Sequence, residues 1–75
     1  MDENIRKRVY ATFANSDFAK KTGDERHKLR QYKIETHIEV LFWMLENDEM
    51  PDELRTKIKK RLKYWLDAYE RDYVI

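Results

Sequence analysis

The acidic and basic residues of this chain are separated into blocks, and their order limits how the chain can fold. Residues 35–53 contain seven acidic residues and no lysine or arginine, and residues 55–63 contain six basic residues. Upstream, residues 26–33 contain four bases, and three acids lie within residues 67–72. If the chain reverses near residues 47–50, opposite charges face each other along both halves. The blocks therefore predict an antiparallel helical hairpin.

The composition favours a small all-α protein. The 75 residues include one glycine and one proline, which leaves few turn residues for β-hairpins. We expect a single helical domain spanning residues 1–75, because a chain of this length is too short for two cores. A small domain without cysteine has no disulfide to strengthen it, so we expect its stability to come from helix packing or self-association.

Apolar spacing places three helices. Ile5, Val9 and Phe13 recur every four residues and predict a first helix over about 3–14. A second helix is expected over about 23–46, starting near Gly23. Its main apolar stripe is formed by Ile34, Ile38, Leu41 and Leu45. A third helix is expected over about 51–72, with Pro51 at its first position and an apolar face formed by Leu54, Ile58, Leu62, Trp65 and Tyr69. With the turn centred between residues 48 and 49, Arg30 would come level with Asp67.

The second helix carries another apolar stripe on its opposite side. This stripe is formed by Leu29, Tyr32, Thr36, Val40 and Trp43. At 100° per residue, Trp43 points about 160–180° away from the main stripe. We expect the first helix to cover this second stripe, at least in part. The alternative is that part of the stripe stays open as a surface for a second copy or another protein, since Trp and Tyr are enriched at binding hot spots.

The chain offers little material for catalysis. It has no cysteine, and Ser16 is its only serine, within a capping-type Asn-Ser-Asp sequence. His27 and His37 have no metal-ligand partner at helical spacing. We therefore predict that the protein is not an enzyme and has no catalytic residues, cofactor or metal.

We also predict a cytoplasmic protein that does not enter membranes. No N-terminal basic stretch is followed by an apolar run, as a signal peptide would require. The longest apolar run covers residues 40–45, far short of the ~20 residues that span a bilayer.

Our leading functional prediction is a non-enzymatic protein-protein interaction module. Such a chain suits a small adaptor or inhibitor, of the kind found in phages or mobile elements, that docks on a larger protein and also forms a homodimer. The predicted partner-binding residues are Tyr32, Val40 and Trp43, with Asp48 and Glu49 steering a basic partner. The sequence does not identify that partner.

The alternative prediction is a small helical nucleic-acid-binding protein. Lys57, Lys59, Lys60 and Lys63 would then contact phosphates from the third helix. Two features weigh against it: the net charge is only +1, and the turn before this helix is acidic.

Overall fold

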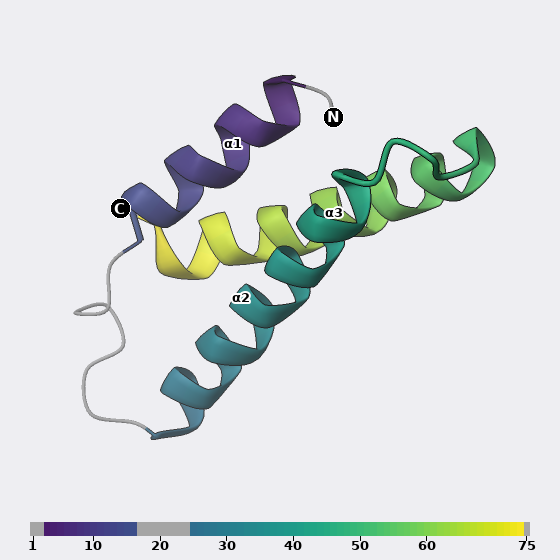
Figure 1. The fold of residues 1–75 in the computed structure, drawn as a ribbon. Helices are drawn as coiled ribbons and strands as arrows, with labels where there is room; N and C mark the ends of the chain where they lie inside the picture. The colour runs from purple at the N-terminus through teal and green to yellow at the C-terminus, as the bar shows by residue number, and fades with distance from the viewer. Residues whose placement is uncertain (1–2, 17–24, 75) are drawn as a thin grey trace.

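The computed structural model describes residues 3–16 and 25–74, which form three α-helices (Figure 1). Helix α1 spans Glu3–Ala14, α2 spans Glu25–Leu45 and α3 spans Asp52–Tyr73. The predicted all-α, three-helix architecture is therefore confirmed, and both ends of α1 and α3 and the C-terminal end of α2 lie within one residue of the expected positions. The start of the second helix expected at Gly23 lies outside the described residues.

Helices α2 and α3 form the predicted antiparallel hairpin and make the most extensive contact between elements. Their chain reversal covers residues 46–51. Pro51 has an extended backbone (φ −60°, ψ 144°) and is the N-cap of α3, one position before the first helical position predicted for it. The Arg55 side chain reaches back across this turn. Its guanidinium donates to the carbonyl oxygens of Leu45 (3.0 Å) and Asn47 (2.7 Å), which the end of α2 leaves without a helical partner.

The core fills the space between the three helices. Ile34, Ile38 and Leu45 come from the predicted main stripe of α2, and Ile58, Leu62 and Leu66 come from α3. Tyr69 and Tyr73, near the end of α3, are also fully buried. Leu41 and Trp65 are only partly buried and pack against this cluster, and Leu54 is exposed.

Buried polar groups around Tyr69 are hydrogen-bonded to one another. The Tyr69 hydroxyl donates to Glu35 (2.6 Å) and accepts from the amide nitrogen of the buried Gln31 (3.0 Å). Burial, together with the Glu35 hydrogen bond, raises the pKa of Tyr69 to about 12. The phenol therefore stays neutral and keeps its donor role at ordinary pH.

Helix α1 lies beside the hairpin and runs parallel to α3 and antiparallel to α2 (Figure 1). The pairs Arg8–Asp67 and Thr12–Glu70 keep an almost constant difference in residue number, as parallel helices require. Beyond the two helices, an isolated antiparallel β-bridge joins Ser16 to Val74. Ile5 and Val9 of α1 join the core, and the Phe13 ring meets the Tyr69 ring edge-on at 5.7 Å.

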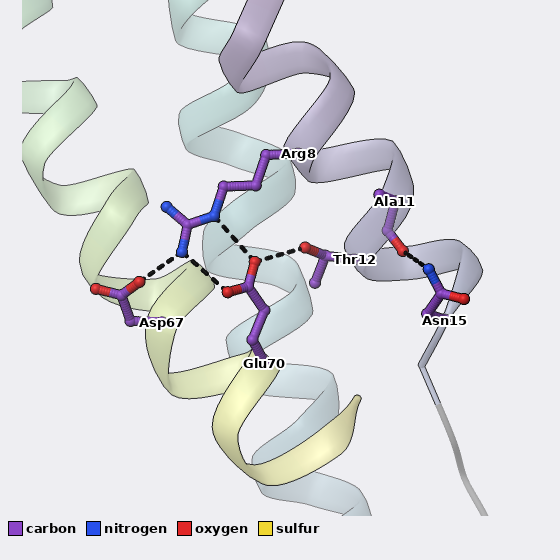
Figure 2. A network of polar contacts seen from close by, with 6 residues as sticks. All are labelled: Arg8, Ala11, Thr12, Asn15, Asp67 and Glu70. Carbon is purple, nitrogen blue, oxygen red and sulfur yellow. Dashed lines mark hydrogen bonds and ion pairs between the residues drawn. The ribbon is translucent and has the colours of Figure 1, made fainter. Parts of the chain in front are cut away.

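A half-buried ionic network fixes α1 to α3 (Figure 2). Glu70 accepts from the Arg8 guanidinium through both oxygens (2.9 and 3.0 Å) and from the Thr12 hydroxyl (2.9 Å). Asp67 accepts a further hydrogen bond from Arg8. The hydrogen bonds from Arg8 hold the pKa of the Glu70 carboxyl below its ordinary value.

The hairpin register differs from the predicted one, because the residue of α3 level with Arg30 lies about one and a half helical turns further along than expected. Arg30 pairs with Asp72 (2.8 Å) and not with the expected Asp67, which instead pairs with Arg8 of α1. Likewise the His37 ring stacks on Trp65, at 4.5 Å between ring centres. Packing of the large rings of α3 against α2 sets this alignment, because exposed ion pairs contribute only ~0.2–1 kcal/mol each.

The predicted match between the acids of α2 and the bases of α3 is wrong. In the described part of the chain, no ion pair joins an acid of α2 to the basic residues 55–63. Lys57 pairs only within its own helix, with Glu53 at 4.0 Å. The acids of α2 are therefore not neutralised by the basic block of α3 in the described residues, although Arg30 of α2 does pair with Asp72 of α3.

None of the described helices is long and apolar enough to cross a lipid bilayer.

Candidate interaction surface

The second apolar stripe of α2 lies on the side of the helix that faces away from the hairpin core. We call it the outer face of α2 and define it by Leu29, Tyr32, Thr36, Val40 and Trp43. Tyr32 is 70% exposed, Trp43 69%, Leu29 67% and Val40 43%. Thr36 is also exposed, and its hydroxyl donates to the carbonyl oxygen of Tyr32 within the helix (2.9 Å). Its polar group therefore has a partner even when water is excluded from this surface.

The expectation that the first helix covers this stripe is wrong for these residues. Helix α1 buries Ile5, Val9 and Thr12, but against the core and α3. The network around Glu70 holds α1 beside the hairpin, and from there Tyr10 contacts the edge of α2, with its ring 5.9 Å from that of Phe42. The alternative, an open stripe, describes the structure better.

A continuous patch of large exposed apolar side chains is unusual on a soluble protein. At about 150–250 Å² per fully buried aromatic side chain, the outer face offers on the order of 500 Å². Apolar patches of this size on small soluble proteins often mark interaction sites. Trp43 also borders a hollow of about 420 Å³ between α1 and α2, lined with it by Val9, Tyr10, Phe13, Glu39 and Phe42.

A second hollow adjoins the other end of the outer face. It measures about 400 Å³ and is lined by Leu29, Arg30, Lys33, Ile34 and Trp65. The outer face is thus bounded by an acidic, aromatic-lined hollow at Trp43 and by a basic hollow at Leu29.

The predicted steering acids lie apart from the apolar anchors. Asp48 and Glu49 are exposed in the turn between α2 and α3, where the Glu49 amide donates to the Asn47 side chain (3.0 Å). In the described residues no hydrogen bond or ion pair connects either carboxylate with Tyr32, Val40 or Trp43.

The basic residues of α3 divide between two sides of the helix. Lys57 and Lys60 line a shallow groove of about 530 Å³ together with Arg61, Tyr64 and Trp65. Lys59 and Lys63 are not part of this groove. The structure therefore adds an exposed tyrosine and a partly buried tryptophan to two of the four predicted nucleic-acid-binding lysines. The sequence contained this signal as the pair Tyr64-Trp65, one turn after the lysines.

Among the residues that the structure describes, no group of three His, Asp or Glu side chains is placed to hold a metal ion. Comparison with known proteins finds no matching family model, no matching curated protein and no matching solved structure.

Proposed function

We propose that this chain is a non-enzymatic protein-protein interaction module whose contact surface is the outer face of α2. The supporting observation is the exposure of Tyr32 and Trp43 on a helix whose opposite side is fully committed to the core. Because the core does not need these two side chains, they are available as anchors in an interface. A small adaptor or inhibitor that docks on a larger protein fits this surface.

Photo-crosslinking tests the proposal. A benzophenone side chain at Tyr32 should crosslink to a discrete protein in the cells that produce the chain, whereas the same group at Tyr64 should not. Tyr64 is a matched control because it is a similarly exposed tyrosine on α3 (64%). The proposal fails if no adduct forms at Tyr32 or if both positions give the same adducts.

The Trp43→Ala variant provides the quantitative prediction. With the crosslinked protein purified, calorimetry should show that Trp43→Ala weakens binding at least about tenfold, as expected for a hot-spot tryptophan. Tyr64→Ala should leave the affinity unchanged. Neither substitution should alter the helix content, since both side chains are mostly outside the core. Unchanged binding by Trp43→Ala would assign the contact to another surface.

The groove along α3 supports a second candidate function, binding of single-stranded nucleic acid. Lys57, Lys60 and Arg61 would contact phosphates, and Tyr64 offers a ring on which a base can stack. The acidic residues of α3 limit this surface, because Asp67 lies two turns after Lys60 on the same helix.

Fluorescence anisotropy with labelled single-stranded RNA and DNA tests this candidate. We expect binding at low salt that weakens as salt rises, and Lys60→Glu should weaken it for every sequence. Lys63→Glu is the matched control, because Lys63 lies outside the groove. Absence of binding at low salt, or equal effects of the two variants, would eliminate the groove as a nucleic-acid site.

A further inference from the structure

The outer face of α2 has the regular spacing of a straight stripe on an α-helix, and this spacing allows the face to pair with its own copy. Its residues are spaced by three, four, four and three, so that Thr36 stands at the centre of a palindrome. In an antiparallel pair of identical helices centred on Thr36, facing residue numbers sum to 72. Leu29 then faces Trp43, Tyr32 faces Val40, and Thr36 faces its own copy.

We infer that the partner of this surface is a second copy of the chain, paired through α2 in an antiparallel, two-fold symmetric dimer. The inference rests on the proposed function, since it needs the outer face to be an interaction surface. In this arrangement each aromatic ring meets an aliphatic side chain, which avoids a clash between two large rings. The small Thr36 at the crossing point lets the helices approach closely, and its hydroxyl already donates within the helix.

Charge supports the antiparallel direction. Residues 26–33 of α2 contain four bases, and residues 35–46 contain three acids and no base. A sum of 72 places the segment 26–33 opposite 39–46 of the second copy, so basic and acidic halves meet. A parallel dimer would oppose like charges over the same length. Within one chain Arg30 pairs with Asp72, Glu46 pairs with Arg6 and Glu35 accepts from Tyr69, so the acids of α2 are not matched by the bases 55–63 of α3 in the described residues.

Two charged residues, Lys33 and Glu39, border the outer face on opposite edges, about 60° to either side of Thr36. Lys33 and Glu39 are exposed and take part in no ion pair among the described residues. Their numbers sum to 72, so Lys33 and Glu39 of the second copy come to the same height but lie on opposite edges of the interface. Tyr32 of the second copy lies on the same edge as Glu39, and its height along the helix axis differs from that of Glu39 by only one residue. Its hydroxyl can therefore donate to the Glu39 carboxylate.

The available area sets the expected strength. Two outer faces together bury on the order of 1,000 Å², at the small end of specific interfaces. Tyr10, which is 62% exposed beside Phe42, enlarges the contact modestly. We therefore expect a dimer that forms at micromolar concentration and exchanges readily, not an obligate one. A larger protein that binds the same face would compete with the second copy.

Sedimentation velocity at increasing concentration tests for the dimer. The wild-type chain should shift from monomer to dimer, and Trp43→Lys should move the midpoint at least about tenfold higher. Tyr64→Lys is the matched control and should leave it unchanged. The inference is overturned if the chain is still monomeric at a protein concentration on the order of several hundred micromolar. It is also overturned if the chain dimerises and Trp43→Lys does not weaken the dimer.

Disulfide trapping tests the direction, because the chain has no native cysteine. A mixture of Tyr32→Cys and Val40→Cys should form the mixed disulfide at least about tenfold faster than either variant forms its own. In the antiparallel register position 32 of one chain faces position 40 of the other. The two copies of position 32 stand about 12 Å apart along the helix axis, which is too far for a disulfide. Faster self-linking of Tyr32→Cys would overturn the antiparallel arrangement.

These results separate the inference from the function on which it rests. A monomeric chain whose Tyr32 photoprobe still captures a different protein refutes the second copy and leaves the interaction surface standing. A monomeric chain without such capture refutes both. The exposed positions of the variants keep them folded, which circular dichroism verifies.

Discussion

Replacing Leu62 by alanine should lower the free energy of unfolding by about 3 kcal/mol, the typical cost of a leucine-to-alanine cavity in a core. Leu62 has no exposed surface and belongs to the cluster that joins all three helices. A 75-residue domain has roughly 4–11 kcal/mol of stability in total, so this change alone should bring the protein close to unfolding at physiological temperature. Urea unfolding followed by circular dichroism measures the loss.

Leu54→Ala is the matched control for this prediction. Leu54 lies on the same helix but is 45% exposed, so the same truncation should cost less than about 1 kcal/mol. Both variants are best measured at one low protein concentration, since dimerisation would add stability that depends on concentration. If both variants lose the same free energy of unfolding, Leu62 is not packed in the core.

Glu70→Gln should loosen α1 from the rest of the protein. Glu70 accepts from both Arg8 and Thr12, and the neutral amide cannot form the same paired, charge-assisted contact with Arg8. Because the carboxylate is 35% exposed, we reduce the usual value for such hydrogen bonds and expect about 1 kcal/mol. Hydrogen exchange should show faster exchange of the α1 amides, with α2 and α3 less affected.

The same substitution should reduce the sensitivity of the fold to acid. The folded-state pKa of Glu70 lies below its ordinary value of 4.5, so the unfolded chain takes up this proton first as the pH falls. The Glu70 contribution to stability is therefore complete above pH 4.5 and is lost as the pH falls through the lower, folded-state pKa. Asp72, whose pKa is lowered by hydrogen bonds from Arg71 and Arg30, should preserve part of the acid effect in the variant.

Asp67→Asn serves as the control for the Glu70 predictions. Asp67 also accepts from Arg8, but it is 70% exposed, so water screens the interaction. We expect little change in the exchange of α1 and in the acid response. If Asp67→Asn releases α1 as much as Glu70→Gln does, the half-buried carboxylate is not the main attachment of α1.

The candidate surface could be found in the sequence, although its exposure could not be foreseen. The helical spacing of Tyr32, Val40 and Trp43 is enough to predict that they lie opposite the main stripe of α2. Whether they were covered depended on where α1 packs, and that position is set by contacts such as Arg8 to Glu70, which are 62 residues apart in the chain. The groove that joins Lys60 to Tyr64 likewise required the side-chain arrangement along α3.

The three helices, the chain reversal near Pro51 and the two opposed stripes of α2 all follow from local sequence patterns. These are local properties, because a period of 3.6 residues and a proline act over only a few positions. The pairing of charges, the shifted register of the hairpin and the exposure of the outer face depend on how the three helices pack together. Single exposed ion pairs are too weak to select a register, and the fit of buried rings such as Tyr69 and Tyr73 depends on all three helices together.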